Sequence, residues 1–210
     1  MARLLKFHHR PLWHMPPGTT TLMVVFLVAG IVVGALLVRV VDAHQKQDLI
    51  GHLEGFVQGL MQQSPLPDSG MVWQISAWQH LRMAGMLWFL GLTVIGLPLI
   101  CALVFVRGWL MGFTVGFFVQ ELGYHGVVLS VAGVLPHHLL GIPVFMFLAT
   151  YVGHFSFTLH QQRSLRRELA VRIALYTLVC IGLTLLLLGA SLIEAHVSPW
   201  LMLLALRWLS

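Results

Sequence analysis

The sequence predicts an all-α fold, a polytopic membrane helical bundle of about five transmembrane helices with a re-entrant half-helix. Three observations predict it. Hydrophobic residues make up 58% of the 210 residues and charged residues only 9%, a balance far from that of a soluble domain. Long uncharged runs recur along the chain. Basic residues flank these runs. We therefore expect a single integral membrane domain over residues 1–210.

Four apolar runs are long enough to cross a bilayer, which takes about 20 residues in a helix. They cover Gly18 to Val38, Met83 to Val106, His138 to Leu159 and Ile173 to Ile193. The first run is too long for the apolar part of a cleaved signal peptide, and no small-x-small cleavage site follows it. We expect it to remain on the protein as a signal anchor.

The positions of the basic residues predict the orientation. Lys and Arg are retained on the cytoplasmic side, and positions 3, 6, 10, 107, 163, 166, 167 and 172 all flank apolar runs. If Arg107 and Arg163 are both cytoplasmic, the chain crosses an even number of times between them. We expect one span at Trp109 to Leu122, a re-entrant half-helix at Gly126 to Leu135, and then the run that starts at His138. The N-terminus is then cytoplasmic and the C-terminus extracytoplasmic.

The segments outside the membrane follow from this orientation. Residues 1–19 and the loop 160–172 are expected in the cytoplasm, and residues 42–82 and the interfacial tail 194–210 on the outer side. The net charge of +5 is then explained by topology and anionic lipids, with no nucleic acid partner.

An apolar stripe at helical spacing lies within the outer segment. It contains Leu53, Phe56, Val57 and Leu60, while polar residues occupy the opposite face. Such a stripe is typical of a helix lying on the outer leaflet. It is also suited to contact with an extracytoplasmic partner, and these four residues are the predicted partner-binding surface.

Two sets of glycines repeat at intervals of four residues. One set is Gly30 and Gly34, and the other is Gly108, Gly112 and Gly116. In lipid, glycines one turn apart allow two helix backbones to approach closely. The stripes predict tight helix packing within one subunit, or alternatively the interface of a homo-oligomer such as a dimer.

Polar residues and prolines gather between positions 121 and 143. They are Glu121, His125, Pro136, His137, His138 and Pro143. The prolines predict helix breaks at Leu135 and Ile142, because the residue before a proline avoids helical geometry. We interpret the group as a structural turn and polar cluster near the outer interface, with His137 and His138 at the start of a span.

A metal site is the alternative for this region. Glu121 and His125 are four residues apart, and His137 or His154 could supply a third ligand. However, the stretch has no HExxH pattern and no thiolate ligand, and Gly123 interrupts the helix. We therefore predict no metal site.

Enzymatic motifs are missing from the sequence. It has no glycine-rich phosphate loop, no nucleophile elbow and no paired carboxylates. Cys101 and Cys180 lie inside apolar runs, where they are expected to act as small hydrophobic residues. We predict a protein that is not an enzyme and needs no cofactor.

Two motifs together carry a family resemblance. The order RG-x3-G-x3-G, beginning at Arg107, followed by LPH-x5-P, beginning at Leu135, is similar to the stage II sporulation protein M family of endospore-forming bacteria. The resemblance extends over nearly the whole chain, from the cytoplasmic start to the closing "EAHVSPWLM". It implies a membrane protein with five spans.

The resemblance also implies a function. Members of this family look like membrane anchors that localise two peptidoglycan-degrading partners, stage II sporulation proteins D and P, in the mother-cell membrane during forespore engulfment. Membrane lipids are the other expected partners. The alternative function is a small-solute or ion transporter or channel with broken helices around Glu121.

Overall fold

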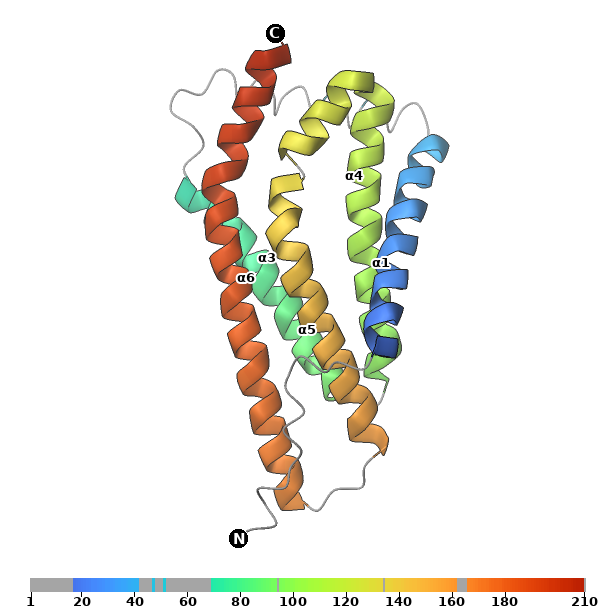
Figure 1. Ribbon diagram of the computed structural model, residues 1–210, viewed down its shortest axis with the longest axis vertical. Helices are drawn as coiled ribbons and strands as arrows, with labels where there is room; N and C mark the ends of the chain where they lie inside the picture. The colour runs from blue at the N-terminus through green and yellow to red at the C-terminus, as the bar shows by residue number, and fades with distance from the viewer. Residues whose placement is uncertain are drawn as a thin grey trace.

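The computed structural model describes residues 17–41, 47, 51, 69–93, 95–133, 135–161 and 166–209. Within these residues the chain forms helices and no strand, which confirms the all-α bundle (Figure 1). The elements are α1 (Pro17–Leu37), the 3-10 helix η2 (Val38–Val40), α3 (Ser69–Gly91), α4 (Gly96–Gly133), α5 (Leu135–Gln161) and α6 (Arg166–Leu209).

The long helices alternate in direction (Figure 1). α1 rises through the bundle, α3 descends, α4 rises, α5 descends and α6 rises. The end of α1, the start of α3 and the end of α6 therefore lie at one end of the molecule. The start of α1, the turn between α3 and α4 and the turn between α5 and α6 lie at the other end.

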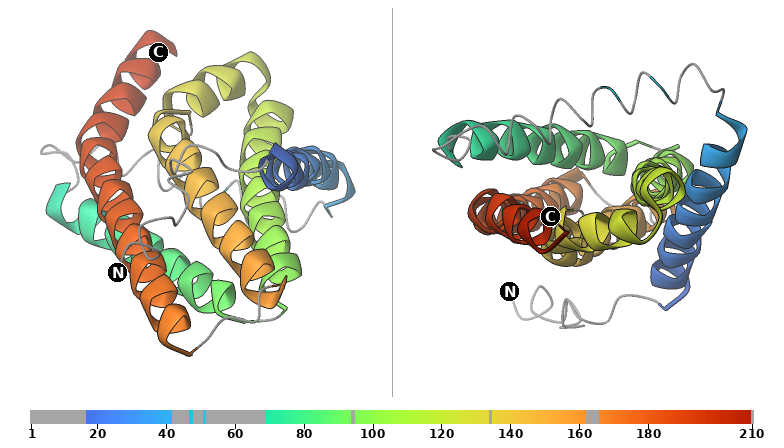
Figure 2. Two further views of the ribbon diagram at one scale, coloured as in Figure 1. Left: turned by 60° about the horizontal axis from the view of Figure 1, so that its bottom comes forward. Right: turned by 90° about the horizontal axis from the view of Figure 1, so that it is seen from above.

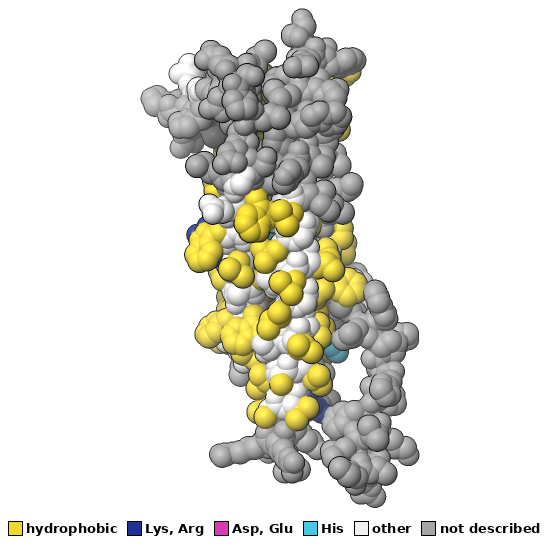
Figure 3. All heavy atoms as spheres, turned by 90° about the vertical axis from the view of Figure 1, so that its left-hand side faces the viewer, with side chains coloured by type: hydrophobic (Ala, Val, Ile, Leu, Met, Phe, Trp, Pro, Cys, Tyr) yellow, Lys and Arg dark blue, Asp and Glu magenta, His cyan; other side chains and the backbone are white. Residues whose placement is uncertain are grey.

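The outer surface of the bundle is apolar. Yellow hydrophobic side chains cover the described part of the face that α6 presents in Figure 3, and Leu178 on α6 is 66% exposed. Four helical segments, 17–40, 96–131, 141–159 and 169–192, are long and apolar enough to cross a membrane. A continuous exposed apolar surface of this kind is stable only in contact with lipid, so the protein is located in a membrane.

The predicted boundaries of spans two and three are wrong. Met83 to Val106 is not one helix, because α3 ends at Gly91 and α4 starts at Gly96. α4 then continues without a break through Arg107, which the charge pattern had placed in a cytoplasmic turn. α3 begins at Ser69, inside the 42–82 segment that was expected to lie outside the membrane. Which part of α3 lies in the membrane stays a prediction.

Side chains from two other helices fix the turn between α3 and α4. The last four carbonyl groups of a helix have no intrahelical donor. The Tyr176 hydroxyl donates to the Trp88 carbonyl at 2.9 Å, and the Thr93 N–H donates to the Leu90 carbonyl at 3.0 Å. Ser156 on α5 donates its hydroxyl to the Thr93 carbonyl at 3.0 Å. The turn is therefore held by both α5 and α6.

The two glycine stripes face each other between α1 and α4, which lie side by side at one edge of the bundle (Figure 2). A Cβ atom built on Gly30 would lie 2.2 Å from the Phe105 carbonyl oxygen, and one on Gly112 would lie 2.1 Å from the Ile31 carbonyl oxygen. No side chain larger than hydrogen fits at these distances. The residues that make these approaches are Gly30, Gly34, Gly108, Gly112 and Gly116.

An aromatic group joins α5 to α6 inside the bundle. The Tyr176 ring stacks on Phe155 at a centroid distance of 4.0 Å and on Tyr151 at 5.9 Å. Cys101 and Cys180 are buried free thiols. Cys180, like Tyr176, belongs to the main hydrophobic core.

The helix breaks predicted at Leu135 and Ile142 have different outcomes. α4 ends at Gly133 and α5 begins at Leu135, so the first break is present. At Gly123 the backbone adopts a positive φ of 56°, and residues 124–133 form a short helical segment that turns back toward the start of α5 (Figure 1). This segment overlaps the predicted half-helix, and its entry into the membrane stays a prediction. The predicted break at Ile142 is wrong, because α5 continues through Pro143. Packing against neighbouring helices allows a proline inside a membrane helix.

A substitution at Gly112 tests the contact between α1 and α4. Gly112→Ala should lower the free energy of unfolding by about 3 kcal/mol, because the new methyl group forces the two backbones apart. The matched control is Gly182→Ala on α6, where nothing lies within 4 Å of the added Cβ. There the better helix propensity of alanine should leave stability unchanged or raise it by up to about 1 kcal/mol. Thermal unfolding in detergent would measure both, and equal effects would contradict the packing assignment.

Removing one hydroxyl group tests the tie between α6 and the end of α3. Tyr176→Phe should cost about 1 kcal/mol of stability, because the Trp88 carbonyl loses its donor inside the bundle. Tyr124→Phe is the control, since Tyr124 is 66% exposed, and it should leave the melting temperature unchanged. If both variants melt like the wild type, the Tyr176 hydrogen bond does not stabilise the turn.

Candidate functional site

Arg107 is a charged residue in the middle of a membrane helix. It lies eleven residues after the start of α4, or about 16 Å along the helix axis, within a segment apolar enough to cross a membrane. Its Nε atom is buried and has no hydrogen-bond partner. Ionisable residues at this depth are costly and commonly mark functional sites.

Two histidines from other helices lie near Arg107. His80 on α3 and His138 on α5 are both within electrostatic range of the Arg107 charge and of each other. The Arg107 guanidinium lies over the Phe145 ring of α5, with Cζ 5.7 Å from the ring centroid. The site is therefore built where α3, α4 and α5 meet.

His80 has a defined orientation. Its Nδ1 atom lies 2.8 Å from the Ser76 carbonyl oxygen, which can only accept, so Nδ1 carries the proton. The Nε2 atom then faces α5 at Gly141, where an added Cβ would lie 3.8 Å away. The absence of a side chain on Gly141 leaves space beside this nitrogen.

The local charge balance is positive. Glu121 is the one carboxylate whose side chain the structure describes, and it lies fourteen residues further along α4, or about 21 Å away. It is too far from Arg107 to form an ion pair. The site therefore presents Arg107, His80 and His138 with no described carboxylate beside them, and it is suited to binding an anion.

The predicted polar cluster is only partly brought together. Gly123 breaks regular helical geometry between Glu121 and His125, so these two residues do not share one continuous helical face. His125 is exposed and its ring meets the Tyr124 ring edge-on at 6.4 Å. His138 lies in the first turn of α5, as expected, but its neighbours are Arg107 and His80.

A metal centre has no support in the described part of the chain. Among the residues that the structure describes, no group of three His, Cys, Asp or Glu side chains could hold a metal ion. His154, one of the candidate ligands, is sixteen residues from His138 on α5, about 24 Å along the helix.

Several predicted site residues lie outside what is described. The side chains of Pro136 and His137 belong to this group, although the backbone of both is part of α5. The partner-binding stripe of Leu53, Phe56, Val57 and Leu60 also lies outside the described residues. Their roles stay predictions.

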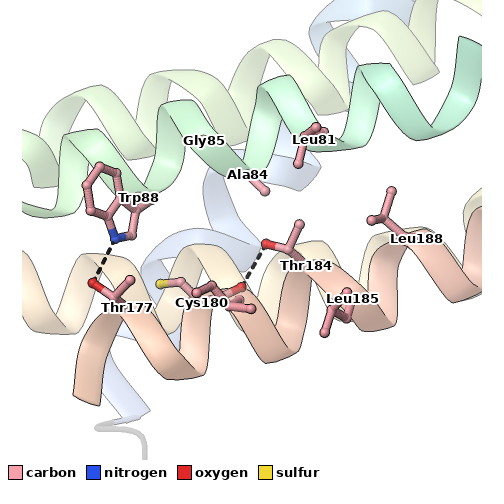
Figure 4. Close-up of a pocket in the computed structure, with 10 residues that line it drawn as sticks. Leu81, Ala84, Gly85, Trp88, Thr177, Cys180, Thr184, Leu185 and Leu188 are labelled. Carbon is pink, nitrogen blue, oxygen red and sulfur yellow. Dashed lines mark hydrogen bonds between the residues drawn. The ribbon is translucent and has the colours of Figure 1, made fainter. Parts of the chain in front are cut away.

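A pocket of about 390 Å³ lies between α3 and α6 (Figure 4). Leucine, isoleucine and alanine side chains form most of its wall, and Trp88 donates from Nε1 to the Thr177 hydroxyl at 3.1 Å across it. Exposed Ile181 and Leu185 at its rim place it on the outer surface of the bundle. The lining contains no charged group, so the pocket suits an apolar occupant and no acid–base chemistry.

Sequence patterns do not by themselves identify Arg107 and His80 as site residues. The charge pattern assigns Arg107 to a cytoplasmic turn, although uncharged and mostly apolar residues continue for ten positions on either side of it. The glycine repeat that follows directly, at 108, 112 and 116, also requires one unbroken helix through this point. These two features together could have placed Arg107 inside the membrane.

Comparison with known proteins identifies the family of the chain. No curated protein and no solved structure matches the chain. The family model described as stage II sporulation protein M matches residues 23–199, which covers most of α1, all of α3, α4 and α5, and most of α6. The match therefore covers the helices of both the glycine interface and the Arg107 site. The chain belongs to the stage II sporulation protein M family, a family of sporulation-related membrane proteins.

Proposed function

We propose that this protein is a membrane anchor that holds peptidoglycan-degrading enzymes against the cell wall for forespore engulfment. Membership of the stage II sporulation protein M family is the observation that carries the proposal. The proposed partners are stage II sporulation proteins D and P, in keeping with the resemblance, and the proposed location is the engulfing membrane of the mother cell.

The proposed mechanism is positional. An enzyme tethered at the outer surface of the membrane works at a much higher effective concentration on the adjacent wall than the same enzyme free in solution. The anchor needs a rigid fold and a contact surface but no bond chemistry of its own. The close contact of α1 with α4 and the tie of α3 to α5 and α6 are consistent with a rigid fold.

We propose an N-in, C-out topology. The segment between α5 and α6 contains Arg163, and α6 begins with Arg166 and Arg167. The start of α1 lies at the same end of the bundle. Acidic residues follow α1 and precede α3, at positions 42, 48, 54 and 68. With Arg107 assigned to the interior, the charges at the two ends follow the positive-inside rule.

The proposed contact surface for partners is on the outer side. The segment between α1 and α3 starts and finishes at the outer end of the bundle, because both helices have their adjoining ends there (Figure 1). The apolar stripe of Leu53, Phe56, Val57 and Leu60 lies in this segment. The spacing of these residues, i, i+3, i+4 and i+7, is that of the apolar residues by which an amphipathic helix binds a hydrophobic groove.

Negative charges introduced into the apolar stripe test partner recruitment. Phe56→Glu and Leu60→Glu should reduce the amount of wall hydrolase that co-purifies with the tagged full-length protein from sporulating cells by at least about tenfold, because apolar anchors dominate such contacts. Gln58→Glu and Gln62→Glu add the same charge on the polar face and should leave recovery unchanged. Equal recovery of hydrolase with all four variants would show that the stripe is not the contact surface. If no hydrolase co-purifies with the wild type, the anchor function is rejected.

Thiol labelling tests the topology. Gln63→Cys should react with a membrane-impermeant maleimide added outside intact protoplasts, and Gln162→Cys should react only after permeabilisation. The wild type serves as the blank, because Cys101 and Cys180 are buried. Labelling of Gln162→Cys in intact protoplasts would reverse the proposed orientation.

A further inference from the structure

We propose that the junction of α3, α4 and α5 around Arg107 is a binding site for a phosphate-type oxyanion inside the membrane bundle. The source of the anion is either an anionic phospholipid headgroup or free inorganic phosphate. This inference goes beyond the proposed anchor function, which does not require any ligand in the bundle.

The first step is the unmatched charge of Arg107. A guanidinium group keeps its charge under all physiological conditions and presents its donors in a planar fork that fits phosphate oxygens. Its Nε donor is buried without a partner, and the described carboxylate on the same helix, Glu121, is about 21 Å away. A bound oxyanion would supply both the missing acceptor and the missing negative charge.

The second step is the position of the two histidines. His80 and His138 are the nearest titratable groups from α3 and α5, and both lie within electrostatic range of Arg107. An imidazole near an anion can take up a proton and donate to it. The junction therefore presents one permanent cation, Arg107, and two imidazoles that become donors to an anion when they take up a proton.

The third step is the backbone of α5. The helix begins at Leu135, and His138 lies in its first turn, where backbone N–H groups lack intrahelical acceptors. The start of α5 lies well below the upper end of α4, because the chain turns back after Gly123 (Figure 1). The positive end of the α5 dipole is thereby brought toward the same interior region.

A polar face of α3 leads from the outer end toward the site. Trp73, Ser76 and His80 are spaced by three and four residues, so they lie along one face of the helix. The Trp73 indole Nε1 is buried and has no hydrogen-bond partner. This indole lies about 10 Å along α3 from His80, between the outer end of the helix and the site.

The space available decides between a small anion and a partner helix. A carboxylate on a membrane helix from another protein would need about 10 Å of lateral room beside Arg107. The described helices α3, α4 and α5 are in direct contact with one another, and Phe145 covers the guanidinium on one side. Gly141 opens only a small space next to His80. These contacts leave no room for a further helix between α3, α4 and α5, which favours a small anion as the ligand.

The test uses the full-length protein purified in dodecyl maltoside, a detergent without phosphate. Thermal unfolding is followed after addition of inorganic phosphate, of phosphatidylglycerol, or of chloride at matched ionic strength. The melting temperature of the wild type should rise with one of the two phosphate sources and not with chloride. A rise with phosphatidylglycerol alone assigns the site to a lipid headgroup, and a rise with inorganic phosphate assigns it to the free ion.

Variants at Arg107 link the effect to the site. Arg107→Met should abolish the rise, and its stability without phosphate should equal or exceed that of the wild type, because an uncompensated buried charge has been removed. Arg107→Lys keeps the charge but loses the fork, so the apparent affinity should fall about tenfold. The control is Arg82→Gln, which removes an exposed arginine that lies over Trp78 on α3 and should leave the rise intact.

Three results would overturn the inference. They are no rise with either phosphate source, the same rise in Arg107→Met as in the wild type, and a rise that appears only with an added membrane helix carrying a carboxylate. The last result would assign Arg107 to a protein partner. Hydrolase co-purification reports separately on the anchor function, so each proposal can fail without the other.

Discussion

The contact between the backbones of α1 and α4 is the constraint on which the rest of the arrangement depends. In lipid, apolar side chains gain little by meeting one another, so shape decides which helices pair. The five glycines of the interface let two backbones meet at distances that no side chain would permit. This contact also sets the direction of Arg107. Gly108 faces α1, and the preceding residue is turned about 100° away on the helix, toward Phe145 of α5.

The second set of constraints lies at the turn between α3 and α4. Tyr176 and Ser156 supply donors to backbone carbonyls that a helix end and a turn leave open, and both are themselves buried. These hydrogen bonds from α5 and α6 stabilise the short turn between α3 and α4. They also fix α3 against α5 and α6, which keeps His80 opposite the start of α5 and completes the junction around Arg107.

The fold class and several elements could be predicted from composition and periodicity, because apolar length and glycine spacing depend only on local sequence. The all-α bundle, the span starting at Gly18 and the span starting at Ile173 are examples. The spans on either side of Arg107 could not be predicted in the same way. A charge ordinarily marks the end of a span, and only the packing of three helices makes an interior arginine tolerable. The role of His80 could not be predicted either, because no sequence pattern relates His80 to Arg107 or to His138.

The Arg107 site connects the fold to its surroundings. An arginine inside hydrocarbon costs several kcal/mol unless a partner or water compensates it, and any ligand that binds only the folded bundle stabilises it in proportion to its occupancy. If a phosphate-type anion is that ligand, the same bundle that positions partners also responds to the lipids or ions around it. A protein whose proposed task is to hold others in place would then be most stable where anionic groups are abundant. Arg107, which lies outside the glycine interface of α1 and α4, would be the residue that couples stability to these groups.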